Sequence, residues 1–338
     1  MEKLNNKESI QQCLLYDFLQ QWHKKKGIKV RTSGSTGVPK EILLSNDTIE
    51  RSARRTINYF GLHKKSHLHA AISFDFIGGK MMIARSLVAG CRLTFSEPSL
   101  TPELPCGEMP IDLMSVVPAQ MIHILDNLDL YRNVKRFLIG GSAVDSRLWD
   151  RIVNSGINAW ESYGMTETAS HVALRRICSS SDTRPRFIPL SGIFVNTDSE
   201  SRIHIRDEKN FFTTNDCGKS FTDGSFVVWG RMDNIIISGG IKINPLQIED
   251  ILGSRLSDFL DDFFISSVPD EKWTSKIVLV GNPSIKVCKN DRKVLANQIQ
   301  NVIENISAEI LPFKYRPKEI ILKDELAYTA SGKLIRKI

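Results

Sequence analysis

The chain has 338 residues, a quarter of them charged, and 45 basic against 38 acidic residues give a formal net charge of +7. This length allows two or three domains. The charge excess is modest and includes no long basic run, so it suits an anionic small molecule at least as well as nucleic acid, and we expect no nucleic-acid partner. No apolar run is long enough to span a membrane, the amino terminus lacks the apolar core of a signal peptide, and six scattered cysteines show no metal-ligand spacing. We therefore expect a cytoplasmic protein without membrane insertion.

The first half of the chain is predicted to alternate between helices and strands. Residues 8–26 are predicted to form an amphipathic helix, because Ile10, Leu14, Phe18 and Trp22 recur at helical spacing. We expect strands over residues 69–74, 92–95, 111–117, 135–139 and 157–162, and helices over residues 46–60, 80–89 and 145–154, with a further helix opening at Pro118. This alternation predicts an α/β domain whose mostly parallel sheet is covered on both faces, with ligands beyond the carboxyl ends of its strands.

The pattern changes after about residue 184. Short strands around residues 193–195, 203–205 and 226–229 alternate with turns, which predicts a small antiparallel β subdomain. A boundary is indicated at residues 230–233. Residues 234–338 then combine strands with helices near 245–256 and 292–310, so we expect a compact α+β domain at the carboxyl end.

Residues 30–40 form the stretch with the strongest chemical signal. Its sequence is Val-Arg-Thr-Ser-Gly-Ser-Thr-Gly-Val-Pro-Lys, and apolar residues 42–44 follow as a second strand. Glycines let backbone N–H groups approach phosphate oxygens, hydroxyls add further donors, and Lys40 supplies a charge. The stretch lacks the spacing of the common nucleotide-binding loop and lies between two strands rather than before a helix. A polar Ser/Gly turn without function is the alternative interpretation.

Four polar clusters need a common explanation: this loop, residues 163–167, residues 214–216 and residues 329–333. Their order and spacing resemble the adenylate-forming superfamily of acyl- and aryl-CoA ligases, adenylation domains and luciferases. Residues 230–233, 239–243, 248–249 and 331–333 match further motifs of that superfamily. The resemblance covers residues 28 to 338. It implies a large N-terminal AMP-binding domain (1–232), in which the first subdomain is largely missing, hinged at Asp233 to a mobile C-terminal lid domain (233–338).

The resemblance also implies a role for each matching residue. The expected ATP contacts are Thr32, Ser33, Ser35, Thr36, Lys40, Gly141, Ser142, Ala143, Tyr163, Gly164, Met165, Thr166, Asp216, Arg231 and Lys333. Tyr163 is expected to stack on adenine, Asp216 to accept from the ribose hydroxyls and Glu167 to hold Mg²⁺. Lys333, Thr166 and Glu167 are the expected catalytic residues. Lys333 is expected to bridge the substrate carboxylate and the α-phosphate, where charge develops as AMP is transferred.

Within the superfamily, residues 162–170 and 237–240 are most similar to o-succinylbenzoate–CoA ligases of menaquinone synthesis. Arg85 aligns with an arginine that those enzymes use near the substrate, and an exposed helix charge is the alternative interpretation. Ser73, Ser170 and His171 are further candidates for the aryl pocket. The resemblance thus implies that the chain uses ATP and Mg²⁺ to convert a carboxylic acid into its acyl-adenylate and then its CoA thioester.

The sequence departs from the family pattern in two further places, and these bear on which acid is bound more than on the binding of ATP. Phe74-Asp75 stands where many relatives carry an aromatic–histidine pair, and Asn215 precedes Asp216 where glycine is usual. Alternative functions are another aryl- or acyl-CoA ligase, an enzyme that loads a carrier-protein thiol, and an inactive nucleotide-binding interaction protein. Because a missing subdomain would bare apolar surface, we also expect self-association, most simply as a homodimer.

Overall fold

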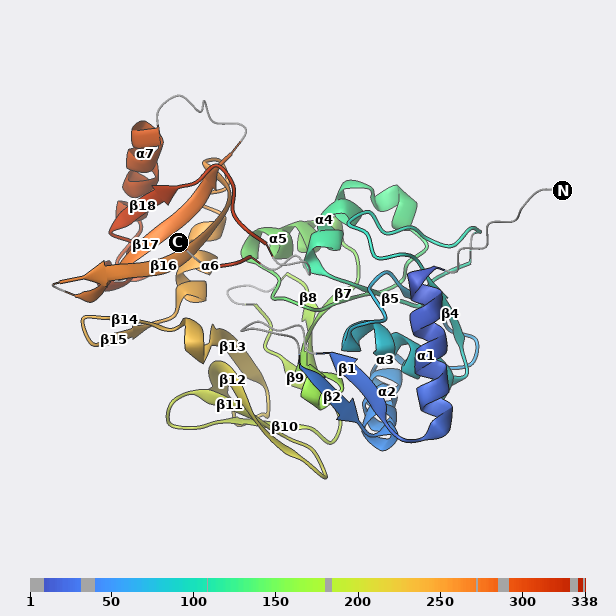
Figure 1. The fold of residues 1–338 in the computed structure, drawn as a ribbon. Helices are drawn as coiled ribbons and strands as arrows, with labels where there is room; N and C mark the ends of the chain where they lie inside the picture. Colours follow the sequence, from blue (N-terminus) through green and yellow to red (C-terminus); the bar gives the residue numbers. More distant parts are fainter. Residues whose placement is uncertain are drawn as a thin grey trace. The chain divides into compact units, whose positions relative to one another are not determined.

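The structure is a computed structural model that describes residues 9–31, 40–107, 109–179, 184–271, 273–284, 292–328, 334–336 and 338. The chain divides into two compact units (Figure 1). The first comprises Met1–Val144 and Leu148–Phe194, and the second comprises Asp145–Arg147 and Val195–Ile338. The hinge at Asp233, and the boundary placed there for a lid domain that moves, stay predictions.

A seven-stranded sheet forms the centre of the first unit, with the strand order β4-β3-β5-β6-β7-β8-β9. Its strands are β3 (His67–Ala70), β4 (Arg92–Phe95), β5 (Leu113–Val116), β6 (Phe137–Ile139), β7 (Ala159–Met165), β8 (Ser170–Ile177) and β9 (Ile188–Pro189). The strands from β4 to β7 are parallel, whereas β8 and β9 pair antiparallel. The predicted α/β class with a mostly parallel sheet is confirmed, and the antiparallel edge is an addition to it.

Helices cover both faces of this sheet (Figure 1). The helices α4 (Pro118–Asp126) and α5 (Ser146–Ser155) pack on one face through Met121, Ile124 and Ile152. The helices α2 (Asn46–Phe60) and α3 (Ile77–Ala89) pack together and contact the strands from the other face. The predicted bounds of α2 are confirmed because local signals set them. Its N-cap Ser45 accepts from the Thr48 amide, and Gly61 ends the helix with a φ of 63°.

Helix α1 (Ile10–Lys24) lies against α3 and against the hairpin of β1 (Ile28–Arg31) and β2 (Glu41–Leu44). The helix was predicted correctly, and of its four predicted apolar positions Phe18 is buried and Leu14 and Trp22 are half-buried, whereas Ile10 is not. Ile10 is 74% exposed, whereas the next residue, Gln11, is 1% exposed and lies in the core beside the fully buried Phe18. The polar loop between β1 and β2, residues 32–39, lies outside the described residues, and the two flanking strands have the predicted places.

Two strands end at places that the sequence did not predict. Strand β3 ends at Ala70 rather than near residue 74, because the backbone of Ile72 and Phe74 bonds to the side chain of Gln11 instead of to a neighbouring strand. Strand β7 continues to Met165 rather than ending at residue 162, because β8 pairs with it antiparallel along its whole length. Residues 163–165 are therefore part of a strand, and only Thr166–Thr168 form a 3-10 turn.

The second unit contains an antiparallel sheet of β10 (Phe194–Thr197), β11 (Arg202–Arg206), β12 (Phe211–Ser220) and β13 (Phe226–Arg231), with neighbouring strands consecutive in the chain. A hairpin of β14 (Ile236–Ser238) and β15 (Ile241–Ile243) follows. A three-stranded sheet of β16 (Leu260–Asp270), β17 (Thr274–Pro283) and β18 (Glu319–Leu322) then packs with α6 (Pro245–Gly253) and α7 (Arg292–Glu304) around a core that includes Leu252 and Ile299. The small β sheet and the α+β region are both confirmed.

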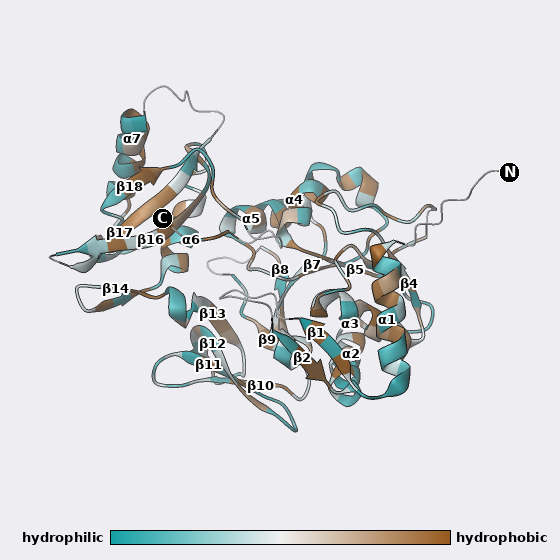
Figure 2. Cartoon of the chain, in the orientation of Figure 1, coloured by the Kyte–Doolittle hydropathy of each residue, from teal (hydrophilic) through white to brown (hydrophobic). Residues whose placement is uncertain are grey.

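Hydropathy follows this packing. Hydrophobic and hydrophilic residues alternate along α1 and α7 (Figure 2), as expected of helices with one buried face. Within the part of the chain that the structure describes, the helices all fall short of the length and apolar character that a membrane span requires.

Three buried histidines predict a dependence of stability on pH. Burial lowers the pKa of His67 and His171, and it lowers the pKa of His69 to about 4. The unfolded chain binds protons at these side chains below about pH 6.5, whereas the folded chain does not until the pH is lower. The stability that the neutral imidazoles contribute is thus complete above this pH and is lost as the pH falls. We expect urea unfolding to show a loss of about 1 kcal/mol per pH unit for each histidine that stays neutral. The change His69→Gln should flatten this slope, and an unchanged slope would assign the loss to other groups.

Candidate functional site

The turn after β6, residues 140–143, is held by a buried ion pair. Glu161 on β7 accepts from the Val144 amide at 3.1 Å and from Nε of Arg175 at 2.7 Å, and both side chains are largely buried. The guanidinium of Arg175 also lies over the rings of Trp149 and Phe187. One carboxylate therefore links β7, β8 and the residue that follows Gly141, Ser142 and Ala143, the turn predicted to contact adenine.

Removing this carboxylate is expected to destabilise the protein strongly. The change Glu161→Ala leaves a buried guanidinium and a buried amide without their acceptor, which costs about 3–5 kcal/mol. The matched control is Glu50→Ala, which breaks the exposed Glu50–Arg54 pair and should cost less than about 1 kcal/mol. Urea unfolding measures both. If both variants lost the same free energy of unfolding, the buried ion pair would contribute no more to stability than the exposed one.

The motif from Tyr163 to Glu167 lies at the carboxyl end of β7. Tyr163 is half-buried with its ring 5.8 Å from that of Phe187, and Gly164 packs so closely on β8 that an added Cβ would lie 2.3 Å from the Ser170 carbonyl oxygen. Met165 ends the strand, and its amide donates to the Thr168 hydroxyl. These contacts turn the chain so that Thr166 is half-exposed and Glu167 is exposed at the edge of the sheet.

Glu167 suits the magnesium role that the sequence predicts for it. Its carboxylate is exposed and has no hydrogen bond or ion pair with any described residue, so its oxygens can serve as ligands. Mg²⁺ typically binds one or two carboxylates and completes its shell with phosphate oxygens and water. The described residues hold no group of three or more His, Cys, Asp or Glu side chains that could bind a metal.

Arg85 lies inside the first unit rather than on a helix surface. It is 1% exposed on α3, its Nε has no hydrogen-bond partner, and its Nη1 reaches only the sulfur of Met82 at 3.5 Å. Its Nη2 lies 3.4 Å from Nδ1 of His171 on β8. Burial lowers the pKa of Arg85 to about 9, so the guanidinium is still charged at neutral pH.

His171 is positioned by hydroxyl groups on α2. Its Nε2 lies 3.0 Å from the Thr56 hydroxyl, and burial together with the adjacent Arg85 charge holds the pKa of His171 well below its usual value. The neutral imidazole therefore accepts from Arg85 at Nδ1 and donates from Nε2. Beside it, the Ser52 hydroxyl donates to the Ala169 carbonyl at 2.7 Å, and Ala169 and Ser170 both adopt left-handed backbone conformations. Arg85 and His171 are thus neighbours, Ser170 precedes His171 on β8, and no described carboxylate neutralises the arginine.

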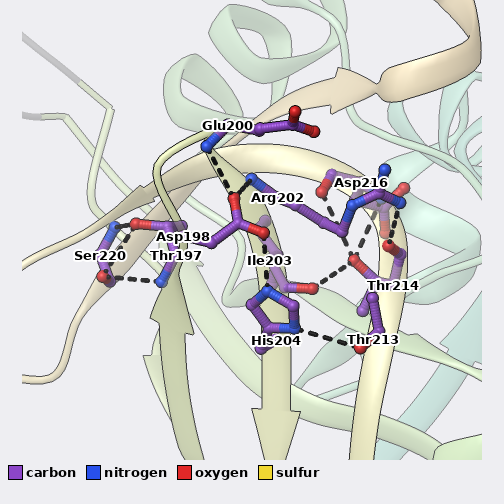
Figure 3. Close-up of polar contacts among 10 residues, drawn as sticks. All are labelled: Thr197, Asp198, Glu200, Arg202, Ile203, His204, Thr213, Thr214, Asp216 and Ser220. Carbon is purple, nitrogen blue, oxygen red and sulfur yellow. Dashed lines mark hydrogen bonds and ion pairs between the residues drawn. The ribbon is translucent and has the colours of Figure 1, made fainter.

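The second unit brings together Asp216, Arg231 and Asp233. Asp216 on β12 and Arg231 on β13 are partners in register, so their side chains share a face of the sheet. The Thr214 hydroxyl accepts from the Asp216 amide and donates to the Ile203 carbonyl, which fixes this part of β12 (Figure 3). Arg231 donates to both carboxylate oxygens of Asp233 and lowers the pKa of that group.

Several predicted site residues lie outside the described part of the chain. These are Thr32, Ser33, Ser35, Thr36 and Lys333. Lys40 is described, and it lies exposed directly before β2. Described residues on either side of positions 329–333 have partners in the second unit. The Tyr328 hydroxyl donates to Asp262 at 2.6 Å, and Arg336 forms a two-bond ion pair with Glu249 of α6.

Comparison with known proteins gives the family of this chain. The profile of the AMP-binding enzymes matches residues 31–225, which is more than half of the chain. The chain belongs to the AMP-binding enzyme family. A curated relative, the 2-succinylbenzoate–CoA ligase of Lactococcus lactis, is 26% identical over 93% of this chain and 70% of its own length.

Solved structures support the same fold. The acyl-CoA synthetase (AMP-forming)/AMP-acid ligase II-like protein from Dyadobacter fermentans is 27% identical, with a TM-score of 0.61 over 99% of this chain and 94% of its own. The O-succinylbenzoate coenzyme A synthetase from Bacillus subtilis, solved with ATP and magnesium, is 19% identical, with a TM-score of 0.74 over 91% of this chain and 68% of its own. The adenylate-forming fold predicted from the motifs is confirmed, and an equally short chain with this fold exists.

Sequence reasoning missed Gln11 and Glu161. Both are buried polar residues whose partners are backbone groups or side chains elsewhere in the chain. Glu161 had one local signal, since a charged residue interrupts an otherwise buried strand and must be paired there. Gln11 had none, because a glutamine on an amphipathic helix is usually exposed.

Proposed function

We propose that this chain is an ATP-dependent acid–CoA ligase that converts o-succinylbenzoate into its acyl-adenylate and then into o-succinylbenzoyl-CoA, a reaction of menaquinone biosynthesis. Membership of the AMP-binding family and the similarity to 2-succinylbenzoate–CoA ligases support this proposal. The observation that carries the choice of acid is the buried guanidinium of Arg85, which has no carboxylate partner among the described residues.

A buried charge without a counter-charge is costly, and a protein retains one where a ligand can pair with it. o-Succinylbenzoate has two carboxylates, and only one is activated. The second carboxylate would accept from Arg85, including the Nε that has no partner, while neutral His171 and Ser170 complete the polar wall. A monocarboxylic acid would leave the arginine unpaired, so the pocket favours a diacid.

The proposed reaction has two steps. In the first, a carboxylate oxygen attacks the α-phosphorus of ATP and pyrophosphate leaves, which forms the acyl-adenylate. In the second, the sulfur of CoA attacks the acyl carbon, the thiol loses its proton and AMP leaves. Both reactants of the first step are anions, so the site must hold them in line and supply positive charge.

The residues of the site take these roles in the proposal. Thr32, Ser33, Ser35, Thr36 and Lys40 bind the departing phosphates; Gly141, Ser142, Ala143, Tyr163, Gly164 and Met165 bind adenine; Thr166 bonds the α-phosphate; Asp216 and Arg231 bind the ribose. Glu167 holds Mg²⁺, which neutralises phosphate charge when it is bound. Lys333 acts in the first step, and Asp233 is the pivot about which the lid domain turns before the second.

A screen of acids tests the proposal. The purified chain is mixed with ATP, Mg²⁺ and one acid at a time, and pyrophosphate release is followed; o-succinylbenzoate should give the fastest release, benzoate and fatty acids much less. CoA or a phosphopantetheinylated carrier protein is then added to identify the thiol acceptor, which should be CoA. Faster release with benzoate than with o-succinylbenzoate would show that the assigned acid is wrong. If no acid released pyrophosphate, the assignment of the chain as an acid–CoA ligase would be wrong.

Two finer points also belong to this proposal. The homodimer is expected to form in solution, and sedimentation of the purified chain at working concentration tests it. A cytoplasmic location fits an enzyme that consumes ATP and CoA.

A further inference from the structure

Helix α1 contributes a buried glutamine to the first unit, although it precedes the residues that match the AMP-binding family, 31–225. Gln11 is 1% exposed, and its amide has three backbone partners. Its Nε2 donates to the carbonyl oxygens of Ile72 at 3.1 Å and Ser96 at 3.4 Å, and its Oε1 accepts from the Phe74 amide at 2.9 Å.

The third partner, Ser96, directly follows β4, whereas Ile72 and Phe74 belong to the segment that joins β3 to α3. It leaves the carboxyl end of a parallel strand, where ligands bind in sheets of this kind, and leads into the helix that carries Arg85. Ser73, a candidate for the acid pocket, lies between the two residues that Gln11 bonds. The ring of Phe74 packs edge-on against Phe95 at 5.2 Å.

The same segment is fixed from the side of α3. The Ser73 hydroxyl accepts from the Asp75 amide at 3.1 Å, and the Ser73 carbonyl oxygen would lie 2.2 Å from a Cβ added to Gly79. Gln11 holds the backbone of Ile72 and Phe74, which pairs with no strand in the part of the chain that the structure describes. Without its amide, two carbonyl groups and one N–H group in this region would lose a partner, and each such loss is costly inside a protein.

Few side chains could replace Gln11 here. The position requires two donors and one acceptor at the end of a side chain of this length. Glutamate keeps the acceptor but has no donor when ionised, and leucine has nearly the same shape but neither donor nor acceptor. The site is therefore built for an amide.

We propose that Gln11 is a positioning residue for the acid pocket: it holds the backbone of Ile72 and Phe74 so that Ser73, between them, keeps its place in the pocket. This inference rests on the proposed function, because it assigns the segment to the acid pocket. It gives α1, which lies outside the family match, a part in substrate selection rather than in stability alone.

The test compares Gln11→Leu and Gln11→Glu with two controls on the same helix. Gln20→Leu changes an exposed glutamine, and Phe18→Leu removes buried volume but no hydrogen bond to residues 72–74. For each variant we would measure the KM values for the acid and for ATP, kcat, the thermal unfolding midpoint and hydrogen exchange of the Phe74 amide.

We expect Gln11→Leu to raise the KM for the acid by about tenfold and to leave the KM for ATP within about twofold, the size of effect that losing one net hydrogen bond gives. The Phe74 amide should exchange faster in Gln11→Leu and stay protected in Gln11→Glu, which keeps the acceptor. Phe18→Leu should lower the unfolding midpoint without changing the ratio of the two KM values. If Gln11→Leu does not fold, Gln11→Glu supplies the KM comparison.

Other results would overturn the inference. Faster exchange at Phe74 with an unchanged KM for the acid would give Gln11 a purely structural role, and unchanged exchange in Gln11→Leu would contradict the hydrogen bond itself. An equal rise of both KM values in Phe18→Leu and Gln11→Leu would assign the effect to general destabilisation. A wild-type chain that adenylates no acid would contradict the proposed function instead, and the exchange of the Phe74 amide would still decide whether Gln11 holds this segment.

Discussion

Replacing Lys333 with alanine is expected to abolish adenylation and to leave thioester formation from pre-made acyl-adenylate largely intact. A lysine ammonium that neutralises charge only as AMP is transferred acts on the transition state of the first step alone. Losing such a group costs about 10²–10³-fold in rate. The two half-reactions are measured separately, by pyrophosphate release without CoA and by CoA consumption with added acyl-adenylate.

Lys333 itself lies outside the described residues. The nearest described contacts in the chain are the Tyr328–Asp262 hydrogen bond and the Arg336–Glu249 ion pair, both within the second unit. The control is Lys314→Ala, which removes an exposed lysine on that unit and should leave both half-reactions unchanged. Equal loss of both half-reactions in Lys333→Ala would refute the assigned role.

Replacing Arg85 with methionine is expected to weaken the binding of o-succinylbenzoate. The folded protein should be as stable as before or more stable. The KM for o-succinylbenzoate should rise about 10- to 100-fold, since a hydrogen bond to a charged partner contributes about 1.5–3 kcal/mol. Benzoate-type monoacids should be affected little. The unfolding midpoint should be unchanged or higher, because a buried charge without a counter-charge is replaced by an apolar side chain.

This combination separates a binding role from a structural one. A structural arginine would lower stability when it is removed and would affect all acids alike. The matched control is Arg54→Met, which changes an exposed arginine on α2 that pairs with Glu50. If Arg85→Met raised the KM for benzoate as much as that for the diacid, the second carboxylate would bind elsewhere.

Local signals allowed much of the fold to be predicted from the sequence. Ser45 and Gly61 mark the ends of α2, and Pro118 opens α4, because capping groups and proline act on their own neighbours in the chain. The order of the polar motifs predicted the adenylate-forming fold, and the family match agrees with it.

The features that the sequence did not predict depend on distant partners. Ile10 was expected on the buried face of its helix, and no place was predicted for Gln11. In the structure Ile10 is exposed and Gln11 is buried, because residues 72, 74 and 96 offer backbone groups to its amide. Strand β7 was predicted too short because residues 163–165, which include Gly164, were assigned to a turn, whereas pairing with β8 extends the strand through them. The sequence left open whether Arg85 is buried, because His171, whose Nδ1 lies next to Nη2 of Arg85, is 86 residues away in the chain.

The central claim is that this chain uses ATP to activate an organic acid, and acid-dependent exchange of labelled pyrophosphate into ATP, measured without CoA, tests it most directly. We predict exchange only when the chain, ATP, Mg²⁺ and o-succinylbenzoate are all present, and exchange slower by about 10²–10³-fold in the Lys333→Ala variant. Exchange that is no faster with any acid than without one would contradict it.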